Sequence, residues 1–226
     1  NEIDKDKLYK FLRDMEFNRL LSSAISTYGE PNLSSVKKNS ELNINQIKIS
    51  NKDYYLIKDI KEIDHWVKEA EEVGEVAVDT ETSSLDPHLA DLIGISLSTK
   101  IGKACYIPIG HKSKNCIDKN KVIEKLKPLL EDLSIKKIGQ NIKFDFIVLY
   151  KHGIKISSME DTMLMSYVLD AGKNRHNMDT LSEIHLDHKT ISFKDLVGSG
   201  KKEINFSEVD IEKAKDYAAE DADITY

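Results

Sequence analysis

The chain has few of the residues that cross-link a protein through sulfur. Its 226 residues include only two cysteines, Cys105 and Cys116. Two cysteines cannot form the disulfide framework that holds many small secreted domains together, and they do not indicate a cysteine zinc site. We therefore expect a protein of a reducing compartment, with the cytoplasm as the default.

Long apolar runs and a secretory leader are also missing. No apolar run approaches the ~20 residues that a membrane-spanning helix needs. The first residues lack the basic-then-apolar pattern of a signal peptide. The composition, 40% hydrophobic and 32% charged, is typical of a water-soluble globular protein. The sequence therefore predicts no association with a membrane.

An excess of positive charge is absent too. The chain has 33 Lys and Arg against 39 Asp and Glu, which gives a net charge of −6. Because duplex binding through phosphate contacts depends on positive charge, the composition argues against a protein that holds duplex DNA in that way alone. It leaves open an enzyme that meets phosphates through bound metal ions, since such an enzyme needs an acidic cluster.

The chain opens with a helical pattern followed by a polar segment. Apolar side chains recur at helical spacing over residues 4–28 without a proline and predict one helix, which the Gly-Glu-Pro sequence at 29–31 ends. The Ser-, Asn- and Lys-rich residues 30–50 predict a linker. We therefore expect an N-terminal helix and linker over residues 1–50 and one larger domain over residues 51–226.

The larger domain alternates short apolar strands with amphipathic helices. Five strands are predicted, at residues 54–57, 76–78, 92–97, 104–109 and 136–139. Helices are predicted at residues 60–73, 119–131, 142–152, 161–169, 178–187 and 207–225. This order predicts an α/β fold with a mixed five-stranded sheet flanked by helices.

Two carboxylates stand where the buried strand 76–78 ends. Asp79 and Glu81 are separated by Thr80. Side chains two apart on a strand point to the same face, so both carboxylates can reach one metal ion. Acidic triplets of this kind are common by chance in so acidic a chain. The strand-end position, where α/β sheets place their ligands, favours a site.

Two further pairs have the spacing of one helical turn. Asn141 and Asp145 share a face at the start of a predicted helix. A helix cap and an ordinary first-turn acid would explain them too, but the helix around Asp145 is apolar nearly all round, and a buried acid needs a partner such as a metal. Tyr217 and Asp221 are also four apart on a late helix, for which a solvated acidic face is the alternative.

In their order and contexts, the three segments resemble the three motifs of the DEDD type of 3′–5′ exonuclease, in its tyrosine-bearing DEDDy branch. Over residues 53–226 the chain is similar to the proofreading domain of bacterial family A DNA polymerases. Five segments carry this resemblance: residues 137–145, 161–164, 175–181, 188–193 and 217–223. Residues 1–30 resemble, more weakly, the segment that follows the 5′-nuclease region in that family.

The resemblance implies a ribonuclease H-like fold and two Mg²⁺ or Mn²⁺ ions. Asp79 would bridge both ions, Glu81 and Asp221 would complete the first metal site, and Asp145 would hold the second. Tyr217, with an ordinary pKa of about 10, is a poor base and would instead orient the attacking hydroxide. The catalytic set implied is therefore Asp79, Glu81, Asp145, Tyr217 and Asp221.

The resemblance also implies a substrate, the 3′ end of single-stranded or frayed DNA, from which deoxynucleoside 5′-monophosphates are removed. Five residues would bind it: Thr82, Leu85, Gln140, Asn141 and Phe193. Leu85 would wedge against the terminal base and Phe193 would line the path of the strand, while Thr82 and Asn141 would contact the terminal nucleotide. A core position for Leu85 and a packing role for Phe193 are the alternatives.

The expected setting follows from the same family. The chain ends at Tyr226 inside a predicted helix, so we expect a fragment without the polymerase domain that would act in cis. The isolated domain is expected to be monomeric, in the bacterial cytoplasm and associated with the nucleoid. Two other functions stay open: a ribonuclease D-like exoribonuclease, and an inactive spacer that binds single strands.

Overall fold

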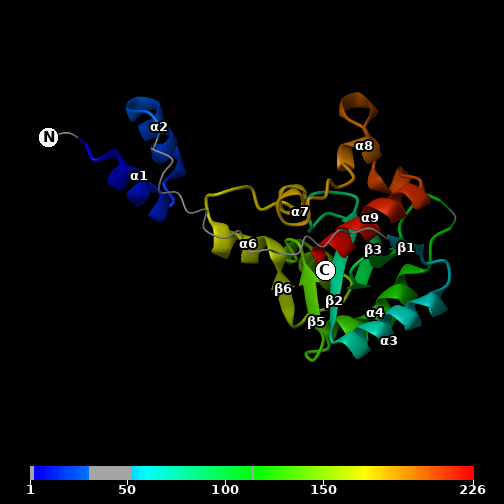
Figure 1. The fold of residues 1–226 in the computed structure, drawn as a ribbon. Coiled ribbons are helices and arrows are strands. Elements are labelled where there is room, and N and C mark those ends of the chain that lie inside the picture. The colour runs from blue at the N-terminus through cyan, green and yellow to red at the C-terminus, as the bar shows by residue number, and fades with distance from the viewer. Residues whose placement is uncertain (1–2, 31–51, 114) are drawn as a thin grey trace. The chain divides into compact units, whose positions relative to one another are not determined.

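A computed structural model describes residues 3–30, 52–113 and 115–226 (Figure 1). The chain divides into two compact units, Asn1–Asn45 and Gln46–Tyr226, each of which is described by itself. The predicted linker lies almost entirely outside the described residues. Within these residues, no helix is both long enough and apolar enough to cross a membrane.

The N-terminal unit contains two helices where the sequence predicted one. Helix α1 (Lys5–Asp14) and helix α2 (Asn18–Tyr28) are separated at Glu16, whose φ of 54° is left-handed and incompatible with a continuous helix. The turn brings α2 back beside α1, where Tyr9 and Leu12 become buried. The single-helix prediction is wrong because a lone helix has no surface against which to bury its apolar stripe.

The larger unit is built on a mixed six-stranded sheet with the strand order β1-β4-β3-β2-β5-β6. Strands β2, β3 and β4 are antiparallel neighbours, whereas β1, β5 and β6 each run parallel to the strand beside them. The strands are β1 (Asp53–Leu56), β2 (Glu75–Thr82), β3 (Leu92–Lys100), β4 (Lys103–Pro108), β5 (Lys136–Gly139) and β6 (Met159–Asp161).

All five predicted strands are present, and the sixth, β6, was not predicted. β6 has only three residues and pairs with β5 at the edge of the sheet. So short a segment shows no periodicity, and it runs directly into the helix that the sequence does indicate. Its strand character comes from the pairing with β5.

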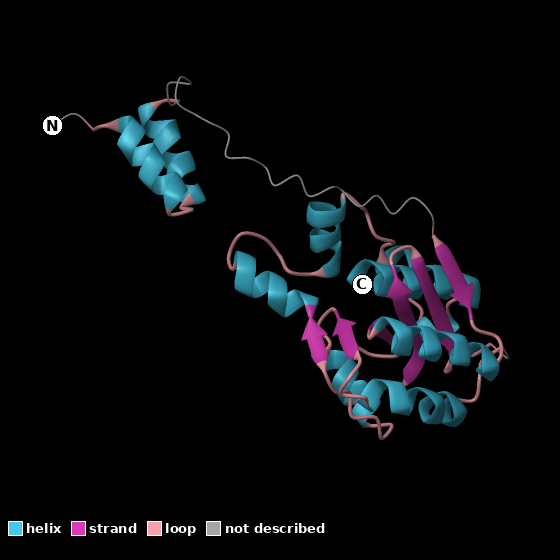
Figure 2. Cartoon of the chain, turned by 60° about the horizontal axis from the view of Figure 1, so that its bottom comes forward, coloured by secondary structure: helices cyan, strands magenta, loops and turns pink. Residues whose placement is uncertain are grey.

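Helices lie on both faces of this sheet (Figure 2). The predicted helices are all present, and the short helix α8 was not expected. They are α3 (Ile63–Val73), α4 (Lys119–Glu131), α5 (Lys143–Tyr150), α6 (Thr162–Asp170), α7 (Met178–Leu186), α8 (Phe193–Val197) and α9 (Ile211–Thr225). Single 3₁₀ turns occur at η2 (Ile60–Glu62), η3 (Gly200–Lys202) and η4 (Phe206–Glu208).

Apolar cores on both faces of the sheet hold these layers together. Helices α3, α4 and α5 bury apolar side chains against one face of the sheet, around Trp66, Ile95 and Leu126. On the other face α9 crosses β4, β3, β2 and β1. Its alanines Ala214 and Ala218 are fully buried, and because alanine is small the helix lies close to the strands. The polar side chains of α9 are therefore held directly over the sheet.

Candidate active site

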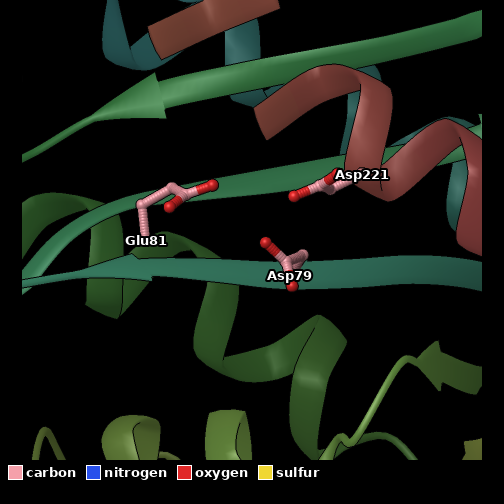
Figure 3. Close-up of side chains that lie close together, drawn as sticks. All are labelled: Asp79, Glu81 and Asp221. Atoms are coloured by element: carbon pink, nitrogen blue, oxygen red, sulfur yellow. The ribbon is translucent and has the colours of Figure 1, made fainter. Parts of the chain in front are cut away.

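Three carboxylates converge between β2 and α9. Oxygens of Asp79, Glu81 and Asp221 all lie within 4.8 Å of one another (Figure 3). The alternation of side chains along β2 directs Asp79 and Glu81 to the face that α9 covers. Asp221 comes down from that helix to meet them. The structure thus brings together three of the four acids that the sequence indicated as metal ligands.

Burial and mutual repulsion shift the pKa values of this cluster upward. Burial raises the pKa of Asp79 from 3.8 to about 6. Burial also raises the pKa of Glu81 and of Asp221 well above the usual range, and the charge of Asp79 adds to both shifts. Charged carboxylates in such a place are costly unless a cation compensates them.

The donor set fits a divalent cation. The Oε1 atom of Glu81 is buried and has no hydrogen-bond partner, a costly state for a carboxylate oxygen. Hard ions such as Mg²⁺ and Mn²⁺ prefer carboxylate oxygens as ligands. An ion among the three carboxylates would both partner this oxygen and offset the repulsion.

Asp145 has a separate anchor and stands outside the three-carboxylate cluster. Its Oδ1 accepts hydrogen bonds from the backbone N of Thr80 at 2.9 Å and from the Thr80 hydroxyl at 2.5 Å. Strand β5 pairs only with residues 75–77 of β2, so Asp145 takes up the N–H that β2 offers beyond that point. Burial and the charge of Asp79 raise the pKa of Asp145.

The sequence correctly indicated a buried acid with a partner at Asp145, which is only 3% exposed. It did not identify Thr80 as that partner. The signal was present, because a threonine between two acids on a strand must face away from both. The cap alternative for Asn141 is wrong, because the cap of α5 is Ile142, and no side chain bonds there.

Tyr217 lies half-buried at the edge of the cluster. Its ring centroid is 5.9 Å from that of Phe193 and 6.2 Å from that of Phe206. Burial, followed by the charges of Asp221 and Glu81, raises the pKa of Tyr217 well above its ordinary value of 10. The hydroxyl therefore stays protonated, and it can donate a hydrogen bond to Asp221.

Two apolar residues predicted to meet the substrate are accessible. Leu85 is 93% exposed, so its alternative as a core residue is wrong. Phe193 is 41% exposed, and its ring lies parallel to that of Phe206 at a centroid distance of 6.2 Å. Phe193 therefore packs on the domain and still offers surface to a ligand.

The polar residues of the predicted substrate site have partners within the protein. The Thr82 hydroxyl donates to the Ser84 carbonyl at 3.0 Å. The Gln140 amide donates to the His176 carbonyl at 2.8 Å and accepts from the Thr162 hydroxyl at 2.6 Å, so both its ends are engaged. The backbone N of Asn141, a residue with a left-handed φ of 59°, donates to Asp161 Oδ1 at 3.0 Å.

A comparison with known families gives the class of this protein. Residues 54–226 match the sequence profile of a family described as 3′-5′ exonuclease. This match covers most of the chain, and the acids of the site all lie within it.

Sequence similarity to curated proteins specifies the family more closely. The chain is 45% identical over 193 residues to DNA polymerase I of Rhizobium leguminosarum, a match that covers 76% of this chain and 19% of that protein. It is 42% identical over 179 residues to DNA polymerase I of Pseudomonas aeruginosa, covering 76% of this chain and 20% of that protein. The chain belongs to the 3′–5′ exonuclease family of bacterial family A DNA polymerases, and it spans about a fifth of the length of these relatives.

Solved structures share the fold. Brucella melitensis NrnC superposes with a TM-score of 0.57 at 26% identity, covering 77% of this chain and 76% of that one. Escherichia coli RNase D, an exoribonuclease involved in structured RNA processing, superposes with a TM-score of 0.56 at 17% identity, covering 76% of this chain and 42% of that one. The ribonuclease H-like architecture predicted from the sequence is thereby confirmed, with six strands in place of five.

Proposed function

We propose that this domain is a metal-dependent exodeoxyribonuclease. It removes deoxynucleoside 5′-monophosphates from the 3′ end of single-stranded or frayed DNA, and it proofreads for a family A polymerase domain on the same polypeptide. The observation that carries the proposal is the convergence of Asp79, Glu81 and Asp221 within 4.8 Å in a 3′–5′ exonuclease family member. We further propose that the domain acts as a monomer in the bacterial cytoplasm, at the nucleoid.

The acids divide into two ligand groups. Asp79, Glu81 and Asp221 would hold one divalent ion, and Asp145 together with Asp79 would hold a second. Bound Mg²⁺ or Mn²⁺ supplies positive charge for the scissile phosphate and lowers the pKa of water. The Thr80 hydrogen bonds support this division, because they anchor the Asp145 carboxylate on β2, where the charge of Asp79 acts on it.

Tyr217 and Glu81 orient the attacking water. The raised pKa of Tyr217 means that its hydroxyl donates a hydrogen bond and does not remove a proton. Alignment of this kind lowers the barrier by holding the reacting atoms in place.

The substrate strand meets exposed apolar groups. Leu85 wedges against the terminal base and Phe193 lines the path of the strand. Contact of bases with apolar and aromatic side chains tolerates any sequence, as proofreading requires. Thr82 and Asn141 contact the terminal nucleotide, and Gln140 supports Asn141 from its bonds to His176 and Thr162.

A nuclease assay on matched DNA and RNA oligomers of one sequence tests the proposal. We expect mononucleotides to be released from the DNA 3′ end with Mn²⁺ or Mg²⁺, and no release with EDTA. Asp79→Ala, Glu81→Ala and Asp221→Ala should each remove nearly all activity while circular dichroism shows an intact fold. Wild-type rates in any of the three would contradict the site assignment.

The same assay separates the two alternatives. Preferential cleavage of RNA would favour the ribonuclease D-like activity, for which the similarity to E. coli RNase D shows the fold alone. Binding of single strands without cleavage in either metal would favour the spacer. The intact acid set supports the nuclease over the spacer.

A further inference from the structure

The side chain of Glu220 is buried next to the active site but takes no part in the carboxylate cluster. It directly precedes Asp221 on α9 and is 1% exposed. Neighbouring residues on a helix point about 100° apart, so Glu220 points away from the cluster that Asp221 enters. A fully buried carboxylate with no catalytic role needs a structural one.

Both oxygens of Glu220 are engaged by other segments of the domain. Oε1 accepts hydrogen bonds from Lys52 Nζ at 2.5 Å and from His188 Nε2 at 3.0 Å. Oε2 accepts from the backbone N of Ile191 at 2.6 Å. Two of these three bonds reach the irregular segment 187–192, which joins α7 to α8.

This segment leads directly to Phe193, the first residue of α8. The segment is also held from α7, where the Ser182 hydroxyl donates to the His188 carbonyl at 2.8 Å. Phe193 in turn contacts Tyr217 on α9. Through Glu220, α9 therefore holds segment 187–192. That segment in turn places Phe193 against Tyr217 on α9.

We infer that Glu220 is a positioning residue, which ties segment 187–193 to α9 so that Phe193 presents its ring to the substrate strand beside Tyr217. The inference rests on the proposed function for its consequence on DNA. The hydrogen bonds between Glu220 and segment 187–193 belong to the fold and do not depend on that function.

The test compares variants of Glu220 with variants of a matched carboxylate. Asp223 is also buried on α9, and it accepts hydrogen bonds from the Tyr54 hydroxyl at 2.8 Å and from the Gly102 backbone N at 2.6 Å. Asp223→Ala thus removes two buried hydrogen bonds of similar kind without touching segment 187–193. Glu220→Gln keeps an acceptor for Ile191 and loses the charge.

The first measurement is amide hydrogen exchange over residues 187–197. We expect faster exchange there in Glu220→Ala, partial rescue in Glu220→Gln, and wild-type exchange in Asp223→Ala. Wild-type exchange rates in Glu220→Ala would contradict the proposal that Glu220 holds segment 187–193. Should Glu220→Ala not fold, Glu220→Gln against Asp223→Asn gives the same comparison.

The second measurement separates positioning from chemistry with two substrates in Mn²⁺. On a short DNA strand, Glu220→Ala should raise KM about tenfold, because the contact of one base with the Phe193 ring is lost and such a contact contributes ~1–3 kcal/mol. Glu220→Gln should raise KM less. On the p-nitrophenyl ester of thymidine 5′-monophosphate, which has no DNA strand for Phe193 to contact, both variants should have wild-type activity.

Equal losses of activity on both substrates would mean that Glu220 acts through Asp221, and would overturn the inference. Failure of the wild-type protein on both substrates would instead contradict the proposed function, and the exchange measurement would still decide the tie.

Discussion

At the scale of single residues, the protonation of Asp79 couples the site to the stability of the fold. Its pKa rises from 3.8 to about 6 on folding. Between these pH values the folded state binds more protons than the unfolded chain, so the free energy of unfolding falls as pH rises from about 4 to about 6. Glu81 and Asp221, whose pKa values are also raised, extend the decline to higher pH.

We therefore predict that the metal-free protein melts at progressively lower temperature as the pH rises from 4 to 8. Mn²⁺ should reverse this loss at pH 7 to 8, because the ion binds only the folded cluster. The measurement is a series of thermal melts in EDTA and in Mn²⁺. Asp79→Asn should flatten the decline and reduce the gain from Mn²⁺. An undiminished gain in this variant would mean that the ions bind elsewhere.

Tyr217 provides a second prediction at this scale. Tyr217→Phe removes one hydroxyl and keeps the ring that packs on Phe193 and Phe206. We expect kcat to fall on the order of tenfold, because one orienting hydrogen bond is lost, with metal affinity nearly unchanged. Asp79→Ala should lose far more, since it removes a metal ligand. Single-turnover cleavage rates, measured together with metal titrations, check this contrast. A wild-type rate in Tyr217→Phe would mean that Tyr217 only packs against its neighbours and does not orient the water.

At the scale of elements, the site depends on how closely β2, β3 and α9 meet. Gly94 of β3 lies opposite Glu81 of β2. A Cβ at this glycine would be 2.2 Å from the hydroxyl of Tyr106, which is fully buried and bonded to His111 at 2.7 Å. The close approach of Tyr106 over Gly94 thus holds the strand next to Glu81.

We predict that Gly94→Ala destabilises the domain by ~1–3 kcal/mol, the usual cost of overpacking, and lowers nuclease activity by displacing β3 beside Glu81. The double variant Gly94→Ala with Tyr106→Leu should lose less stability than the sum of the two single variants, because Tyr106→Leu removes the ring and hydroxyl that the alanine Cβ would meet. Urea denaturation of the four proteins gives these free energies. Simple additivity would show that the Tyr106 contact does not restrict position 94.

At the scale of the whole molecule, the sheet, the helices around it and every candidate site residue lie in the unit Gln46–Tyr226. We propose that this unit carries the exonuclease activity, in line with the division at residue 50 that the sequence suggests. A fragment of residues 46–226 keeps Lys52, the partner of Glu220.

We predict that this fragment folds cooperatively and cleaves single-stranded DNA with a kcat/KM within about twofold of the longer chain, since the core and site of a domain are self-contained. Thermal melting and the oligomer assay compare the two proteins. A fragment that folds but is inactive would assign part of the activity to residues 1–45.

Local sequence patterns were enough to predict most helices and strands and the side of each that is buried. Apolar periodicity reports which side of a strand or helix is buried, so it located five strands and placed Asp79 with Glu81, and Tyr217 with Asp221. These pairs are two and four residues apart, distances over which backbone geometry alone decides direction.

Which element packs on each of these faces depends on contacts between residues far apart in the chain. Thr80 and Asp145 are 65 residues apart, and Lys52 and Glu220 are 168 apart. The pairing of β6 with β5, the exposure of Leu85 and the turn at Glu16 depend in the same way on distant surfaces. Periodicity carries no record of such partners, because a buried face is equally apolar or polar whichever element packs against it. The convergence of Asp221 on Asp79 and Glu81 is therefore a product of the packing of α9 across the sheet.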